Sequence, residues 1–177
     1  GRHLDSLAQK GSINERLLPC PYLDNDNLDF SFSGLKTAAA TLVAERPQLR
    51  EAAGRLRNQE ENPAHASEQD LADFCASFNY SVARTLSLKT ARALKRLRED
   101  GLEVCCLTAA GGVAANSMIR AQLADLARSS GLPLVLPSPS LCTDNGAMVA
   151  YYGYLLACDK LEHKLDMTAV PRGSHIP

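Results

Sequence analysis

Three short stretches of this sequence combine residue types that can do chemistry. The most informative one runs from Thr108 to Asn116, between an apolar segment and a helical pattern, and it contains Gly111 and Gly112. Two glycines at a strand-to-helix turn let the backbone approach a ligand, and the following helix presents unpaired N–H groups to an electron-rich group. In an open α/β sheet, nucleotides bind at such turns, beyond the carboxyl ends of the strands. A tight turn with Asn116 as a cap or first-turn residue fits the same pattern.

The other two stretches place charged side chains at predicted helix starts. Asp144 precedes the last helical pattern, so its carboxylate either caps that helix or binds a metal with ligands from elsewhere. Ser33 and Lys36 open another pattern, either as a cap and a solvated lysine or as groups beside an anionic substrate. No two histidines are four residues apart, the spacing that puts two metal ligands on one helix face. We therefore expect no metal site formed by this chain alone.

The composition favours a soluble globular domain. With 177 residues, 45% of them hydrophobic and 22% charged, the chain is long enough to bury a core. Its net charge of -1 argues against a dedicated nucleic-acid module, so any RNA contact would be local or shared. We expect a cytoplasmic protein, because the sequence shows neither an apolar stretch of about 18 residues, the length that spans a membrane, nor a signal-like start. The cysteines form no CxxC pair and are predicted to be reduced, structural thiols: Cys20, Cys75, Cys105, Cys106, Cys142 and Cys158.

Helix-like and strand-like patterns together predict an α/β fold. The strongest signal is the apolar repeat from Leu71 to Leu97, which predicts a long amphipathic helix capped by Ser67 and ended by Asp100-Gly101. The continuous apolar run from Val104 to Leu107 is typical of a strand buried on both faces. The polar stretch 58–67 predicts a mobile insertion. Further strands are expected at 28–32 and 134–136, and further helices at 4–9, 35–45, 49–57, 114–129 and 145–159.

Three motifs together resemble the TsaD family, also known as Gcp or YgjD and formerly labelled O-sialoglycoprotein endopeptidase. They are FSFSGLKT at 30–37, GGVAAN at 111–116 and CTDNGAM at 142–148. The similarity covers one lobe at 1–172, followed by a tail at 173–177, and corresponds to the second half of the family's fold. It implies the actin-like, Hsp70-like ATPase architecture. In that architecture a nucleotide lies between two ribonuclease-H-like lobes, each a mixed sheet flanked by helices.

The resemblance also implies a reaction and a set of site residues. The family transfers a threonylcarbamoyl group from threonylcarbamoyl-adenylate to the N6 amine of adenosine 37 in tRNA. Its divalent metal, iron or zinc, is held by an HxxxH motif of the first lobe and by the aspartate that matches Asp144, where it acts as a Lewis acid. Gly111, Gly112 and Asn116 match substrate-binding positions. The opening Gly1–Asp5 is similar to the family's GGPxLD segment, which implies substrate-binding roles for Gly1 and Asp5. No catalytic residue is assigned.

The partners implied are tRNA and, in bacteria, TsaB-like and TsaE-like proteins. Because the HxxxH lobe is missing from this sequence, we expect the chain alone to hold metal weakly and not to turn over. One alternative is a non-catalytic assembly domain of the same fold. A glycoprotease, or metalloendopeptidase, is disfavoured because neither a nucleophile with a neighbouring base nor a two-histidine zinc motif is present.

Overall fold

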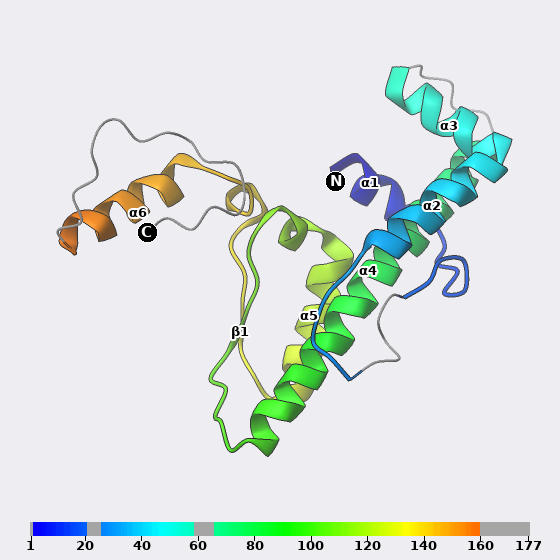
Figure 1. Ribbon diagram of the computed structural model, residues 1–177. Helices are drawn as coiled ribbons and strands as arrows, with labels where there is room; N and C mark the ends of the chain where they lie inside the picture. The colour runs from blue at the N-terminus through cyan, green and yellow to red at the C-terminus, as the bar shows by residue number, and fades with distance from the viewer. Residues whose placement is uncertain (1, 21–25, 59–65, 160–177) are drawn as a thin grey trace. The chain divides into compact units, whose positions relative to one another are not determined.

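The computed structural model describes residues 2–20, 26–58 and 66–159 (Figure 1). The chain divides into two compact units, Gly1–Thr143 and Asp144–Pro177, each described by itself. In chain order the elements are α1 (Arg2–Ala8), α2 (Ser33–Glu45), α3 (Pro47–Asn58), α4 (Ala66–Glu99), β1 (Leu107–Thr108), the 3-10 helix η1 (Gly112–Ala115), α5 (Ser117–Ser130), β2 (Leu134–Val135), the 3-10 helix η2 (Pro139–Leu141) and α6 (Gly146–Cys158). The fold is therefore α/β and rich in helix, which agrees with the predicted class.

The 34-residue helix α4 organises the first unit, because α1, α3 and α5 all pack against it (Figure 1). The long helix predicted over Leu71–Leu97 is thus confirmed. It ends at the predicted stop, where Gly101 has a φ of 73° and the Leu102 N–H donates to the Leu97 carbonyl at 2.9 Å. The helix begins one residue before the predicted cap Ser67, whose side chain lies outside the described residues.

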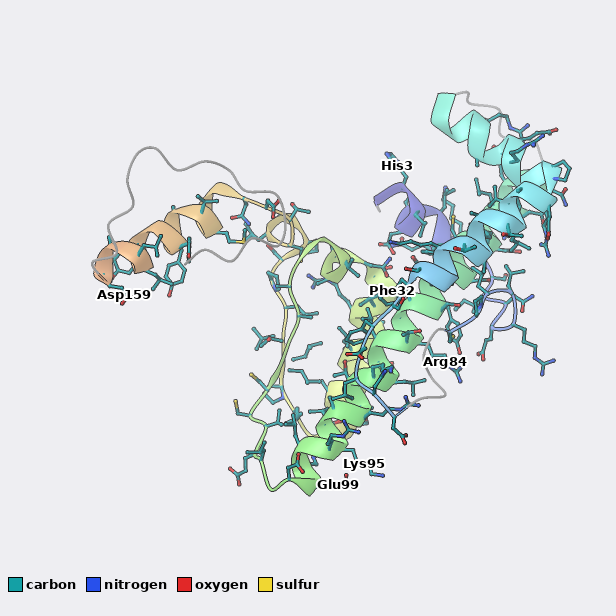
Figure 2. The ribbon with its side chains drawn as sticks, in the orientation of Figure 1. His3, Phe32, Arg84, Lys95, Glu99 and Asp159 are labelled. Atoms are coloured by element: carbon teal, nitrogen blue, oxygen red, sulfur yellow. The ribbon has the colours of Figure 1, made fainter. Side chains whose placement is uncertain are left out.

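One face of α4 forms the main hydrophobic core together with α1, α2 and α3. Phe32, labelled in Figure 2, is partly buried against this core. A smaller cluster of Ala83, Ile119 and Leu123 attaches α5 to α4. The buried residues of the main core are Ala8, Leu18, Leu35, Ala39, Leu49, Ala52, Leu71, Phe74, Cys75 and Ala76. Helix α4 therefore holds both α1 and α5, the two helices on which the candidate site depends.

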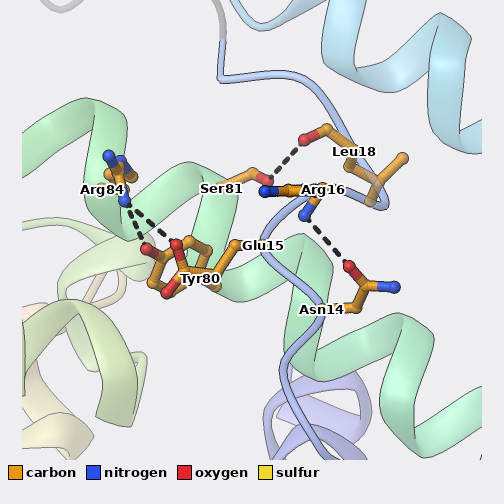
Figure 3. Close-up of polar contacts among 7 residues, drawn as sticks. All are labelled: Asn14, Glu15, Arg16, Leu18, Tyr80, Ser81 and Arg84. Carbon is orange, nitrogen blue, oxygen red and sulfur yellow. Dashed lines mark hydrogen bonds and ion pairs between the residues drawn. The ribbon is translucent and has the colours of Figure 1, made fainter.

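The connection after α1 runs along α4 and is tied to it by polar contacts (Figure 3). The Ser81 hydroxyl donates to the Leu18 carbonyl at 3.4 Å, and Leu18 itself is buried. Arg84 forms an ion pair with Glu15 at 3.4 Å and a hydrogen bond with the Tyr80 hydroxyl. These contacts hold the chain that follows α1 against the middle of α4.

The described residues contain one sheet, whose strands β1 and β2 are parallel. Their register is Leu107 opposite Leu134 and Thr108 opposite Val135. The strand predicted at Val104–Leu107 is misplaced, because β1 begins only at Leu107. The predicted burial on both faces is also wrong, since Cys105 is exposed. Parallel sheets are normally covered on both faces and have several strands. A two-stranded ladder gives the apolar run a single neighbour, and the mixed sheet of the prediction is not seen among the described residues.

The strand predicted at 28–32 is wrong, because these residues do not form a strand. An isolated extended segment needs a neighbouring strand to pair with. The buried Lys89 of α4 instead holds the preceding residue Asn27, by hydrogen bonds from Nζ to its backbone oxygen at 2.6 Å and to Oδ1 at 2.9 Å. The predicted cap Ser33 is also wrong. Phe32 occupies the N-cap position of α2 without a side-chain hydrogen bond, and Ser33 is the first helical residue.

The other predicted helices, and the strand at 134–136, agree with the structure to within about three residues. The predicted insertion falls mainly on 59–65 and the tail on 173–177, both outside the described residues. All six cysteines are free. Cys75 and Cys142 are buried, in agreement with structural thiols, whereas Cys105 and Cys158 are exposed, so the structural role predicted for these two is wrong. Within the described ranges, we find no helix with the length and apolar character that a membrane span requires.

Candidate functional site

The turn between β1 and α5 contains both predicted glycines. Gly111 has a φ of 89°, a conformation that residues with a side chain rarely adopt, so the turn itself requires glycine at this position. Gly112 has no such requirement. A Cβ built on Gly112 would meet only the methyl group of Thr143, at 3.8 Å. The described residues of the first unit thus leave open space beside Gly112, which suits the close approach of a ligand.

Asn116 is the N-cap residue of α5. Its Oδ1 accepts a hydrogen bond from the Ile119 N–H at 3.1 Å, and its own backbone N–H donates to the Val113 carbonyl. The cap alternative for Asn116 is therefore confirmed. The carboxamide Nδ2 makes no hydrogen bond to the described residues. One lone pair of Oδ1 is engaged, whereas both N–H groups of Nδ2 are free, so the side chain can offer a hydrogen-bond donor to an acceptor atom of a ligand.

Asp5 lies at the same helix end, although 111 residues separate it from Asn116 in the chain. Its Oδ1 accepts from the Ser117 hydroxyl at 3.0 Å and from Asn79 Nδ2 at 3.3 Å, and its Oδ2 accepts from the Ser117 N–H at 3.2 Å. Asn79 is 4% exposed, whereas Asp5 is half-buried. A carboxylate at a helix amino terminus is favoured by the helix dipole. Oδ2 receives only this one N–H, so it retains capacity for a further donor.

These contacts correct the expectation of unpaired N–H groups at the start of this helix. Two of the first-turn donors are already satisfied, the Ser117 N–H by Asp5 and the Ile119 N–H by Asn116. Side chains of the protein itself thus occupy two of the donors at this end of α5. The groups that those side chains can still offer a ligand include Asp5 Oδ2 and Asn116 Nδ2.

The sequence analysis did not identify Asn79 or Ser117, the residues that hold Asp5. Asn79 is a polar residue on the buried face of α4, where the apolar repeat calls for a hydrophobic residue. That mismatch is the signal that points to a polar partner. Ser117 carried no such signal, because a serine at the first position of a helix is common.

Two hollows lie near β1. One of about 230 Å³ is lined by mostly apolar residues of α4, β1, η1, α5 and β2, including Leu86, Ala109, Val113 and Leu123. The other, of about 490 Å³, lies before β1 and is lined by Arg98 and Gly101–Cys105. Neither is lined by Asp5 or Asn116. The candidate site at the end of α5 thus lies outside the lining of both hollows.

Asp144 belongs to the second unit and is exposed. The prediction that it caps the last helix is wrong, because Asn145 is the N-cap of α6 and its Oδ1 accepts from the Met148 N–H at 3.0 Å. The Asp144 carboxylate makes no hydrogen bond or ion pair with the described residues. No three potential metal ligands gather among those residues. Asp144 is thus available as a single oxygen ligand.

The remaining candidates contribute less to this site. Lys36 is exposed in the first turn of α2, which agrees with the solvated reading. Gly1 lies outside the described residues. Of the predicted substrate-binding residues, the structure brings Asp5, Gly111, Gly112 and Asn116 to the turn and helix end between β1 and α5.

Comparison with known proteins agrees with the motifs. Residues 1–151 match the family described as TsaD, tRNA N6-adenosine threonylcarbamoyltransferase. This chain belongs to the TsaD family. It is 51% identical over 178 residues to the tRNA N6-adenosine threonylcarbamoyltransferase of Maridesulfovibrio salexigens, across 100% of this chain and 48% of that protein. A protein of the same name from Lawsonia intracellularis is 42% identical over 174 residues, across 98% of this chain and 48% of that protein.

Membership of the TsaD family places the chain in a family of acyl-transferring enzymes. The chain spans about half the length of the curated relatives it matches. Within a TsaD protein, the Gly111–Asn116 turn and Asp5 are therefore part of a larger molecule.

Proposed function

We propose that this chain is the carboxyl-terminal lobe of an actin-like, two-lobed tRNA N6-adenosine threonylcarbamoyltransferase. The single observation that carries this assignment is the meeting of two motif residues, Asp5 and Asn116, at one helix end. The family relationship alone predicts that both bind substrate. Because both lie at the start of α5, we assign them one ligand, the adenylate end of threonylcarbamoyl-adenylate.

In this proposal the chain's residues bind and orient the adenylate. Asp5 accepts a hydrogen bond from a ribose hydroxyl through Oδ2, the oxygen with spare capacity. Asn116 donates from Nδ2 to an acceptor of the nucleotide, and the open space at Gly112 lets the ligand approach the backbone. The carbamoyl carbon is then held for attack by the N6 amine of adenosine 37 of tRNA. The new N–C bond forms as the bond to the phosphate oxygen breaks, AMP leaves, and the amine loses a proton.

The metal that the family uses, iron or zinc, fits this chain only in part. Asp144 supplies one free, exposed carboxylate, and the described residues supply no further cluster of ligands. Asp144 would therefore hold the metal together with the two histidines of an HxxxH motif in another lobe. When bound, the metal would polarise the oxygen on which charge develops. We also propose that tRNA and TsaB-like and TsaE-like proteins are its partners and that it acts in the cytoplasm. We propose further that this chain alone has little activity.

The first experiment is calorimetric titration of a non-hydrolysable threonylcarbamoyl-adenylate analogue. The titrated protein is this chain, alone and mixed with a separately made HxxxH lobe and Zn²⁺. We expect binding that needs the added lobe and falls at least 10-fold in Asp144→Ala, the usual scale for loss of a metal-site group. Asp100→Ala, which removes another exposed carboxylate, serves as the control. Absence of binding in every mixture of folded proteins would refute the proposal.

Asn116 permits a sharper test, because its two roles use different atoms. In Asn116→Asp the side chain still caps α5, since aspartate and asparagine cap equally well, but the free donor is lost. We expect an unchanged melting temperature and analogue binding weakened at least 10-fold. Asn116→Ala should lose both binding and about 1 kcal/mol of stability. Equal binding by wild type and Asn116→Asp would show that Nδ2 does not contact the adenylate.

A second candidate function, a non-catalytic assembly domain, is favoured by helix α6. Six of its large apolar side chains are between 40% and 66% exposed, and such surfaces mark interaction sites. They are Met148, Val149, Tyr151, Tyr152, Tyr154 and Leu155. This function predicts a dimer in sedimentation equilibrium that Tyr152→Glu dissociates. It also predicts that Asp144→Ala changes neither association nor any activity of the complex.

A further inference from the structure

Arg120 of α5 is bound to the loop that follows β2. Its Nη2 donates to the Pro137 carbonyl by a short hydrogen bond and to Cys142 Sγ at 3.3 Å. The Cys142 thiol lies 3.8 Å from the same carbonyl and is 4% exposed. One guanidinium thus joins both ends of the segment 137–142, which includes η2.

The surroundings of Arg120 are unusual for a cation. Arg120 is half-buried, and it forms no ion pair with the described residues, in contrast to Arg128 of the same helix, which pairs with Asp125 at 2.8 Å. Its Nε is buried and has no hydrogen-bond partner among the described residues. A buried donor without a partner costs about 1–3 kcal/mol. Such a cost calls for an explanation, which the other hydrogen bonds of the Arg120 side chain can supply.

The segment that Arg120 holds leads directly into Thr143 and Asp144. Thr143 follows Cys142 and places its methyl group 3.8 Å from a Cβ built on Gly112. Asp144 is the next residue. Consecutive Cα atoms are about 3.8 Å apart, so fixing Cys142 limits where the carboxylate two residues later can lie.

We propose that Arg120 is a positioning residue, whose guanidinium holds segment 137–143 against the start of α5 and thereby restricts the position of Asp144. The link to metal binding rests on the proposed function, in which Asp144 is a metal ligand. Arg120 itself contacts neither metal nor substrate in this inference. A side chain that orients a metal ligand in this way usually changes metal affinity or activity by about 10- to 100-fold when it is removed.

The positioning itself is tested on this chain by amide hydrogen exchange. The Leu141 and Cys142 N–H groups donate to the carbonyls of Ser138 and Pro139, at 2.9 and 3.4 Å. In Arg120→Met we expect both to exchange at least 10-fold faster, because charged hydrogen bonds that hold the loop are lost. In Arg120→Lys the exchange rates should lie between those of wild type and Arg120→Met, because the lysine ammonium can replace only the hydrogen bond to the Pro137 carbonyl. Arg128→Met is the control and should leave the loop unchanged. Unchanged exchange in a folded Arg120→Met overturns the inference.

The consequence for the metal is tested by Zn²⁺ titration of the chain mixed with the HxxxH lobe. We expect Arg120→Met to weaken Zn²⁺ binding at least 10-fold, Arg120→Lys to recover part of it, and Arg128→Met to match wild type. If Asp144→Ala weakens binding and Arg120→Met does not, the inference fails while the proposed function stands. If Asp144→Ala also has no effect, the metal role proposed for Asp144 fails, and with it the link to Arg120. Faster loop exchange in Arg120→Met would then support only the structural part.

Discussion

Replacing Gly11 with alanine should bring the added methyl group into collision with the backbone of α4 and destabilise the fold. A Cβ built on Gly11 would lie 2.1 Å from the Ala72 oxygen, 2.2 Å from the Ala72 carbonyl carbon and 2.6 Å from the Asp73 nitrogen. These are backbone atoms of α4 and cannot rotate away as a side chain can. The connection after α1 must therefore move off α4 by about 1 Å before the contact becomes tolerable.

Such a movement has a cost that follows from two hydrogen bonds. The Ser12 N–H donates to Asp73 Oδ1 at 2.7 Å, and the Asn14 N–H donates to Ser77 Oγ at 2.9 Å. A shift of about 1 Å takes both beyond hydrogen-bond distance. Losing the bond to the carboxylate costs about 1.5–3 kcal/mol, and overpacking adds about 1–3 kcal/mol. Because the two effects share one movement, we expect Gly11→Ala to destabilise the chain by about 3 kcal/mol.

Urea unfolding followed by circular dichroism measures this change. Gly54→Ala is the matched control, because Gly54 lies inside α3 and a Cβ there meets nothing within 4 Å. That substitution should raise stability by about 0.5–1 kcal/mol through its helix propensity. Since α1 carries Asp5, Gly11→Ala should also speed exchange of the Ser117 amide. A loss of less than about 1 kcal/mol in Gly11→Ala would refute the argument.

Two further predictions concern buried groups of α4. Replacing Asp5 with alanine removes the acceptor of the Ser117 N–H and leaves the Asn79 amide buried without it, so urea unfolding should show a loss of about 2–3 kcal/mol. Burial raises the pKa of the Cys75 thiol from 9.0 to about 11. Because the folded pKa lies above the unfolded one, the associated stabilisation is complete below about pH 9 and is lost as the pH rises through about 11. The urea midpoint should fall over that window in wild type and fall less in Cys75→Ala.

Local patterns predicted the helices well because helix formation depends on neighbours along the chain. The apolar repeat from Leu71 to Leu97 and the stop at Gly101 are properties of adjacent turns, and both are confirmed. Gly11 shows the limit of such patterns. In the local sequence Gly11 fits a stop for the helix predicted at 4–9, whereas its closest contacts are to Ala72, 61 residues away. The close approach of two distant backbones leaves no trace in the local sequence.

The strand predictions at 28–32 and at Val104–Leu107 failed for a related reason. The apolar run from Val104 to Leu107 has the composition of a strand covered on both faces, but Cys105 is exposed and, among the described residues, β1 pairs with β2 alone. Burial of a strand is a property of the whole sheet, and this chain spans about half the length of its relatives. The apolar pattern therefore predicts a strand that is covered on both faces. The structure of this chain shows only the strand and helices that the chain itself contributes.

The two interpretations of Asn116 that the sequence left open are compatible, because an amide has two different ends. Serine, aspartate and asparagine all cap a helix through an oxygen, so capping alone does not select asparagine. Only asparagine keeps two N–H donors after its oxygen has accepted the Ile119 N–H. A helix end that already uses Asp5 to satisfy Ser117 can thus be closed by the protein and still present a donor to a ligand. Asparagine at this cap therefore supplies the donor that the proposed substrate-binding role uses.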